Sequence, residues 1–267
     1  KAGKAKGKGR PKEAALNHAN PIEADRAAAP EGAPHVVVVV LKATRRDQIE
    51  AYGGPSDTMP FLTSLAKQGA LFTDAVATSP WNKPAVLSML TGHHAISMGM
   101  IEPGPAGNKR LLAPDVTLLP ERLQAKGWYT VGLTANFNEN VSTGLAQGFD
   151  RYRDSVPMSF VPPGRLNAKD SVPRLMKMLD DRPEGAQGRP VYAQLVWVDP
   201  HKPIMVKPEE FKSFEGEDHK IAPYRAVLNR VDQALDALVA GLNERGMTSE
   251  NTVLMVIADH GEGLLMP

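Results

Sequence analysis

Two polar segments follow apolar runs in the second half of the chain, and their residue types suit metal or anion chemistry. Residues 253–258 lead into Asp259 and His260, and residues 191–198 lead into Asp199-Pro200-His201. A carboxylate and an imidazole at one strand end can both ligate a divalent cation. Because parallel strands end at the same edge of a sheet, we expect the two segments to lie close together. The alternative at each place is an Asp that only initiates or caps a turn.

A third polar segment precedes a predicted helix. Asn82 and Lys83 stand immediately before Pro84, and an apolar stretch follows up to Leu90. The free N–H groups at a helix N-terminus bind anions, and the Lys83 side chain would add positive charge. The alternative is that Asn82 only caps the helix.

The elements that must position these residues alternate between strands and helices. This order predicts an α/β fold with a largely parallel central sheet flanked by helices. Apolar runs predict strands at about 35–41, 72–77, 129–134, 191–198 and 252–258. Helical spacing of apolar residues predicts helices at about 59–69, 84–90, 118–126, 172–179 and 222–244. Residues 102–115 and 136–165 lack periodicity and are predicted to be irregular.

Composition divides the chain into a tail and a domain. The formal net charge is +1, but six basic residues lie within the first twelve positions: Lys1, Lys4, Lys6, Lys8, Arg10 and Lys12. We interpret residues 1–34 as a disordered basic and Ala/Pro-rich tail and linker, and residues 35–267 as the α/β domain. Residues 1–12 could attract a polyanion or a membrane surface, although the chain carries no specific nucleic-acid motif.

The absence of cysteine excludes several kinds of chemistry. With Cys 0, the chain has no disulfide, no thiolate metal site and no cysteine nucleophile. The first residue is Lys1, so we expect that an upstream signal or anchor has been removed.

The order of motifs over residues 35–263 resembles the sulfatase family of the alkaline-phosphatase superfamily. The resemblance begins at the first apolar strand and continues through a series of short segments. In chain order they are Arg45-Arg46-Asp47, Thr58-Met59-Pro60-Phe61-Leu62, Gly69-Ala70-Leu71-Phe72, Ser79-Pro80-Trp81, Leu90-Thr91-Gly92, Ala135-Asn136, Gly148-Phe149-Asp150, Asp199-Pro200-His201 and Ala258-Asp259-His260-Gly261-Glu262. Each piece is short, and their order and spacing carry the resemblance.

The resemblance implies a metal-dependent ester hydrolase. It implies a calcium or magnesium ion held by carboxylates of the first strand together with Asp259 and His260. It also implies a nucleophile just before the Pro-containing helix, at the position of Asn82, beside Lys83. His201 inherits a role near the substrate or leaving group, and Asp199 and Asn136 are substrate-binding candidates. The implied substrate is a small anionic sulfate or phosphate ester.

The chain departs from this pattern at the positions that carry the chemistry. Lys42 stands where the first-strand metal ligand is expected, and an ammonium donates hydrogen bonds but cannot ligate a cation. Asn82 replaces the Cys or Ser that would become formylglycine, and its amide is a poor nucleophile. Asp47 is an alternative source of the missing carboxylate. We expect the Lys42 ammonium to approach the vacated metal position and to pair with Asp259.

Three functions remain open from the sequence. The first is a catalytically degenerate sulfatase-like domain that binds a ligand or a protein partner. The second is an active divalent-metal-dependent sulfate or phosphate ester hydrolase with an unusual nucleophile, Thr44 or Ser79. The third is a polyanion-binding or scaffold protein that acts through the Lys-rich tail. The resemblance further leads us to expect a location in the cell envelope, in the periplasm or outside the cell. It also leads us to expect that the C-terminal part of the fold is truncated or is completed by a second chain.

Overall fold

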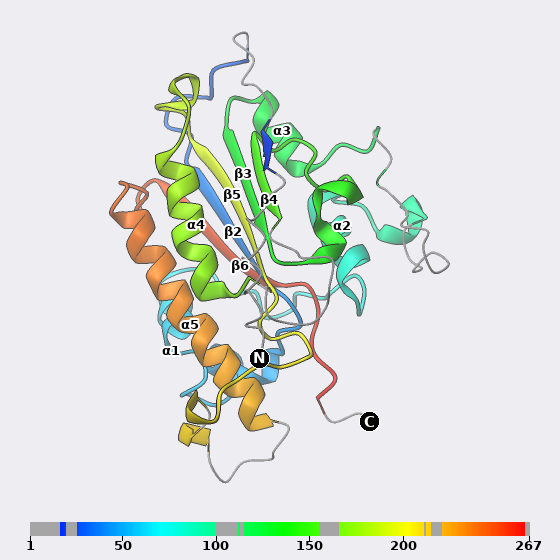
Figure 1. Cartoon of the computed structure of the whole chain (residues 1–267), viewed down its shortest axis with the longest axis vertical. Helices are drawn as coiled ribbons and strands as arrows, with labels where there is room; N and C mark the ends of the chain where they lie inside the picture. Colours follow the sequence, from blue (N-terminus) through cyan, green and yellow to red (C-terminus); the bar gives the residue numbers. More distant parts are fainter. Residues whose placement is uncertain are drawn as a thin grey trace, which may run out of the picture.

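A six-stranded sheet forms the centre of the molecule. The computed structural model describes residues 17–19, 26–99, 112, 115–154, 166–210, 212–214 and 221–264. The strand order is β1-β4-β3-β5-β2-β6 (Figure 1). The bounds are β1 Asn17–Ala19, β2 His35–Leu41, β3 Tyr129–Thr134, β4 Arg151–Asp154, β5 Val191–Trp197 and β6 Thr252–Ala258. The strands from β4 to β6 pair in parallel, and β1 runs antiparallel to β4. The predicted α/β fold with a largely parallel sheet is confirmed.

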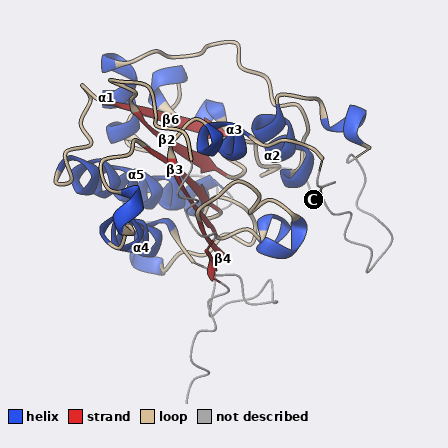
Figure 2. Cartoon of the chain, turned by 90° about the horizontal axis from the view of Figure 1, so that it is seen from above, coloured by secondary structure: helices blue, strands red, loops and turns tan. Residues whose placement is uncertain are grey.

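Helices cover both faces of this sheet. They are α1 Pro60–Gln68, α2 Asn82–Thr91, α3 Leu119–Ala125, α4 Ala168–Asp180 and α5 Ile221–Asn243. Figure 2 shows α1, α4 and α5 on one side of the strands and α2 and α3 on the other. Within the described residues, no helix is both long and apolar enough to cross a bilayer.

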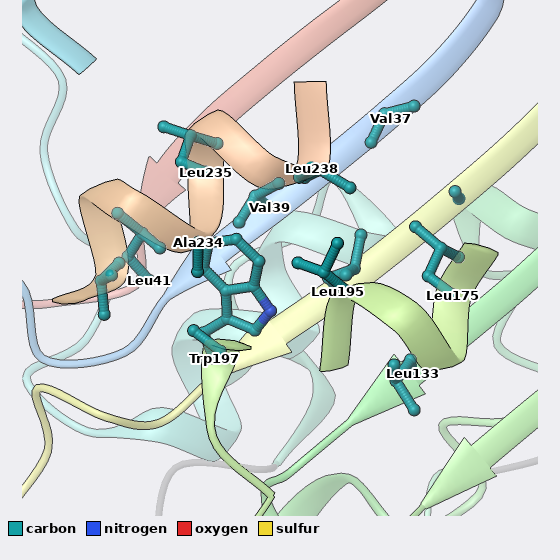
Figure 3. Close-up of a cluster of buried hydrophobic side chains, with 14 of the residues drawn as sticks. Val37, Val39, Leu41, Leu133, Leu175, Leu195, Trp197, Ala234, Leu235 and Leu238 are labelled. Atoms are coloured by element: carbon teal, nitrogen blue, oxygen red, sulfur yellow. The ribbon is translucent and has the colours of Figure 1, made fainter. Parts of the chain in front are cut away.

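The central strands are apolar because both of their faces are buried. On β2, Val37 and Val39 are fully buried in the cluster under α4 and α5, whereas Val38 and Val40 are buried in the cluster on the opposite face. A continuous apolar run is typical of such a strand in a parallel sheet. Figure 3 shows the first cluster, in which Trp197 of β5 lies among aliphatic side chains of α4 and α5.

Strand β6 differs because it lies at the edge of the sheet. Its residues alternate in burial, so that Leu254 and Val256 pack against the core while Val253 and Met255 are about half exposed, at 49% and 46%. The alternation follows from the opposite directions of successive side chains in a strand. One face of this strand is therefore covered and the other is open.

The structure confirms all five predicted helices and four of the five predicted strands. The strand expected at 72–77 is wrong, because this segment is a loop in which Phe72 and Val76 are 72% and 88% exposed and no neighbouring strand pairs with it. Within 136–165 the prediction missed β4, whose sequence RYRD alternates half-buried arginines with the buried Tyr152 and Asp154. Such a short, charged strand has too little apolar periodicity to be predicted. The predicted loop at 102–115 lies mostly outside the described residues.

The segment that enters β2 packs against the domain. Arg26 forms a bidentate ion pair with the buried Asp150, with N–O distances of 2.7 and 2.8 Å, and Asp150 also accepts hydrogen bonds from Gln124 and Thr130. Arg26 lies within the range 1–34 that we interpreted as tail and linker. The part of this range next to β2 is thus held by contacts with the β3–β4 region.

We predict that the protein loses stability in mild acid through His35. Its Nδ1 accepts a hydrogen bond from the backbone N–H of Val191 at 3.0 Å, which requires a neutral ring. Burial lowers the pKa of His35 below its ordinary value of 6.5, and the charge of Arg182 acts in the same direction. The folded state therefore resists protonation of His35. The stability that the neutral ring contributes is complete above the pKa of His35 in the unfolded chain. It is lost as the pH falls from that value towards the lower pKa of His35 in the folded chain.

The measurement is the free energy of unfolding in urea between about pH 8 and pH 5. The decline with acid should become shallower in His35→Gln, whose side chain can still accept the bond. The matched control is His93→Gln, which changes an exposed histidine and should leave the decline intact. Equal slopes for wild type and His35→Gln would contradict the assignment.

Candidate active site around Lys42

Three neighbouring strand ends build the site. The register pairs Leu41 of β2 with Trp197 of β5 on one side and with Ala258 of β6 on the other. The residues that follow are therefore brought to one edge of the sheet, with Lys42 between the two segments that begin at Val198 and Asp259. The predicted convergence of these polar segments is confirmed.

Lys42 is fully buried and lies between two carboxylates. Its Nζ is 2.5 Å from Oε1 of Glu139 and 3.0 Å from Oδ2 of Asp259, and all three side chains are at most 1% exposed. The sequence predicted the contact with Asp259 and did not predict Glu139. Both contacts are buried ion pairs. With Lys42 protonated and both acids ionised, the cluster carries one net negative charge.

Glu139 is positioned by the short 3-10 turn Phe137–Glu139, which follows β3 at the same edge of the sheet. The Asn136 side chain begins this turn by accepting from the N–H of Asn138, and its amide donates to Oε1 of Glu139 at 3.0 Å. Burial raises the pKa of Glu139, and the charge of Lys42 acts against this rise. The available signal in the sequence was an acid three residues after Asn136, directly beyond a strand end.

Asn136 was expected to bind substrate. Its side chain is buried and already holds Glu139 in place, so the contacts that the structure shows for it are internal. The substrate-binding role stays a prediction.

Asp259 and His260 connect the buried cluster to the start of α2. Oδ1 of Asp259 accepts hydrogen bonds from the backbone N–H of Ala43 at 3.0 Å and of His260 at 2.9 Å. The ring of His260 lies between two oxygen acceptors, with Nδ1 2.7 Å from the carbonyl of Gly261 and Nε2 2.7 Å from Oδ1 of Asn82. Because a carbonyl only accepts, Nδ1 carries a proton, and the bond to Asn82 needs either a second ring proton or an amide turned to donate. Asn82, the position implied for the nucleophile, is thus engaged by His260.

His201 lies near His260, Lys83 follows Asn82 at the start of α2, and Asp199 contacts the start of α4. The ring centroids of His201 and His260 are 6.3 Å apart in an edge-on arrangement. Lys83 is the second residue of α2, whose N-cap residue provides no side-chain cap. Asp199 instead binds the N-terminus of α4, where Oδ2 accepts from Ala168 at 2.9 Å, and its Oδ1 lies 3.4 Å from Arg230. The contacts of Asp199 are therefore structural, and its expected role in substrate binding stays a prediction.

The backbone turns sharply directly after Lys42. Ala43 has a left-handed conformation with φ of 54°, which is costly for a residue with a Cβ. Its N–H binds Asp259 and its carbonyl accepts from the Tyr224 hydroxyl at 2.8 Å, so both neighbours hold the turn.

Asp47, the alternative carboxylate, is exposed and paired with Arg45 at 2.7 Å, which lowers the pKa of Asp47. It does not substitute for the missing ligand.

A divalent cation does not fit the residues present. Glu139, Asp259 and His260 are suitable donors in kind, yet the Lys42 ammonium occupies the space between the two carboxylates. A cation placed there would be repelled by this charge and would compete with it for the same oxygens. In the part of the chain that the structure describes, no cluster of three or more acidic or histidine side chains has the placement of a metal site.

Comparison with known proteins gives a consistent result. The family model described as Sulfatase matches residues 34–266. An arylsulfatase of Klebsiella aerogenes is 26% identical over 227 residues, which cover 71% of this chain and 48% of that protein. An ulvan-active sulfatase of Formosa agariphila is 24% identical over 268 residues, which cover 86% and 50%. The chain therefore spans about half the length of these relatives.

Solved structures show the same fold. The crystal structure of Ps i-CgsB superposes with a TM-score of 0.72 at 17% identity, covering 85% of this chain and 58% of that one. The phosphonate monoester hydrolase of Agrobacterium radiobacter gives 0.64 at 15%, covering 86% and 63%. The C-terminal periplasmic domain of EcEptC from Escherichia coli, solved as a complex with Zn, gives 0.66 at 16%, covering 94% and 70%. At such identities the likeness concerns the fold.

We predict that Lys42→Met destabilises the protein by about 3–5 kcal/mol, because it leaves two buried carboxylates without a compensating charge. Replacing the acids as well, in Lys42→Met with Glu139→Gln and Asp259→Asn, should recover most of this loss. The measurement is the free energy of unfolding in urea. Lys126→Met, at an exposed lysine, is the control and should change stability by no more than about 0.5 kcal/mol. A triple variant no more stable than Lys42→Met would contradict the charge argument.

Proposed function

The chain belongs to the sulfatase family, and we propose that it is a catalytically degenerate member that binds an anionic ester or a protein partner at the Lys42 site without hydrolysing it. The observation that carries this proposal is the position of the Lys42 ammonium between Glu139 and Asp259. A lysine fixed by two buried carboxylates supplies the positive charge internally. The Lys42 ammonium thus takes the place of the divalent ion that would stabilise negative charge. Unlike a bound ion, it cannot dissociate into the solvent.

The position of Asn82 supports the same proposal. A primary amide is not an activated nucleophile, and its Oδ1 is held by His260 at 2.7 Å. Neither alternative nucleophile is activated by a contact that the structure shows. Thr44 is buried with its hydroxyl 3.5 Å from the carbonyl of Lys42, and no hydrogen bond to a base is seen for Ser79 among the described residues. Attack on sulfur or phosphorus therefore has no prepared nucleophile here.

Anion binding needs neither a metal nor a nucleophile. The N-terminus of α2 begins at Asn82, and the N-cap residue Trp81 makes no side-chain cap. Backbone N–H groups at such a terminus favour negative charge, and Lys83 adds a cation beside them. We infer that a sulfate or phosphate ester would place its charged group here, bordered by His201 and His260.

We further propose a location in the cell envelope or outside the cell. Support comes from the similarity in fold to a domain of Escherichia coli that is described as periplasmic. The absence of cysteine is compatible with any compartment.

We predict that the wild-type chain does not bind calcium or magnesium in calorimetric titration, because Lys42 holds the carboxylates that would be ligands. Lys42→Asp should bind one ion, since it exchanges the repelling charge for a third carboxylate at the strand ends. The control is Lys126→Asp, which makes the same change of charge at an exposed position and should bind none. Tight, stoichiometric binding by the wild type would refute the proposal.

We also predict that the wild type does not hydrolyse an aryl sulfate or an aryl phosphodiester, measured by the release of the coloured phenol. Any background should be unchanged by a chelator and should be equal in Asn82→Ala. Turnover that a chelator abolishes, and that Asn82→Ala lacks, would establish an active hydrolase instead. Protection of the wild type against thermal unfolding by the uncleaved ester would measure binding in the same samples.

A further inference from the structure

The buried cluster of Lys42, Glu139 and Asp259 contains the reacting groups of an amide bond. The amine nitrogen of Lys42 lies 2.5 Å from an oxygen of Glu139 and 3.0 Å from an oxygen of Asp259, and all three side chains are at most 1% exposed. An amine and a carboxyl group that are held in contact and screened from water can condense, because the reaction becomes intramolecular and the product amide is shielded from hydrolysis. The cluster is therefore a candidate site of covalent modification.

We propose that Lys42 and Asp259 become joined by an intramolecular amide bond between Nζ and Cγ, with Glu139 carrying the protons. This inference rests on the pairing of Lys42 with Asp259 that the proposed function uses. It adds that the charged pair, which forms as the chain folds, is then converted into a neutral amide. The bond consumes the Asp259 carboxylate, so the cross-linked site still lacks the ligands of a divalent cation and the proposed absence of metal is unchanged.

The backbone directs the reaction to Asp259. Oδ1 of Asp259 accepts two backbone hydrogen bonds, from Ala43 at 3.0 Å and from His260 at 2.9 Å. Two fixed N–H donors on one oxygen stabilise the negative charge that develops there when an amine adds to the carbon. The other oxygen, Oδ2, has no aligned hydrogen bond and lies 3.0 Å from Nζ of Lys42 and 3.3 Å from Nε2 of His260, so it is the oxygen placed to leave. Glu139 lacks such a pair of backbone donors on one oxygen, since Oε1 contacts the amide of Asn136 and the Lys42 ammonium, and Oε2 has no hydrogen-bond partner.

Glu139 is suited to carry protons. Its Oε1 lies 2.5 Å from Nζ, so an ionised Glu139 is placed to accept a proton from the ammonium. In the condensation the Lys42 ammonium gives one proton to Glu139, which passes it to Oδ2 of Asp259. The neutral amine then forms the Nζ–Cγ bond, and a second proton moves from nitrogen through Glu139 to Oδ2. The Cγ–Oδ2 bond breaks, one water leaves, and Glu139 returns to its starting form without any change of oxidation state.

Sheet geometry allows the bond without a large movement of the backbone. Leu41 of β2 is paired with Ala258 of β6, and Lys42 and Asp259 are the next residues on these neighbouring strands. The bond would tie the edge strand β6 to the centre of the sheet. It would close a loop that spans most of the domain, which restricts the unfolded chain.

The test is the mass of the full wild-type chain after denaturation, followed by tryptic mapping. We expect a mass lower by one water molecule, no tryptic cleavage after Lys42, and a branched peptide that joins Lys42 to the segment containing Asp259. An unmodified mass with cleavage after Lys42 would overturn the proposal. A mass lower by one water with Lys42 free would also overturn it, because that result identifies a cyclised aspartate elsewhere.

Variants assign the roles. Lys42→Arg and Asp259→Ala should each have the mass calculated from its own sequence, without loss of water, because each lacks one partner of the bond. Glu139→Gln should also show no loss of water, because the proton carrier is gone. Lys126→Arg, at an exposed lysine, is the matched control and should retain the loss of one water. A branched peptide in Glu139→Gln would overturn the role of Glu139. The wild-type measurement requires no variant to fold.

The outcome for this bond can be separated from that for the proposed function. A wild-type chain with free Lys42 that does not bind calcium overturns the amide bond and leaves the proposed function standing. A chain with free Lys42 that binds calcium overturns both. A cross-linked chain that hydrolyses an aryl sulfate overturns the proposed function alone.

Discussion

The buried charge of Lys42 is the constraint on which the site depends. An ammonium removed from water is tolerated only beside compensating negative charge, and the fold supplies two carboxylates, from the segment after β3 and from the end of β6. Each carboxylate is in turn fixed by other groups. Asn136 holds Glu139, and the N–H groups of Ala43 and His260 hold Asp259. The left-handed turn at Ala43 follows from the same requirement, because it aims one of these N–H groups at Asp259.

The arrangement separates what the sulfatase fold provides from what its chemistry needs. Parallel strands, the helix N-terminus at Asn82 and the histidines at 201 and 260 are in place. At the positions where the family resemblance implies a metal ligand and a nucleophile, this chain carries Lys42 and Asn82. The shape of the fold rests on the apolar core of β2 and β5 with α4 and α5, which contains neither Lys42 nor Asn82.

Most of the fold was predictable because its elements have strong local signals. β2 is a run of buried valines, and α5 carries Val227, Val231, Leu235 and Leu238 at helical spacing. The failures lie where local pattern and environment disagree. Residues 72–77 are apolar enough for a strand but have no neighbour with which to pair, and β4 is a true strand of alternating charge that is stabilised by β3 beside it. Strand formation depends on partners that the local sequence does not contain.

The candidate site divides in the same way. By itself the sequence determined that a cation, Lys42, stands at the end of the first strand and that Asp259 and His260 stand at the end of the last, because these are properties of residue type and position along strands. The tertiary structure alone decided that Glu139 joins them, that His260 holds Asn82, and that Asp199 turns towards α4 instead. The physical reason is the strand order β3-β5-β2-β6, which brings together residues that are far apart along the chain. Only this order shows which charges share the interior with the lysine.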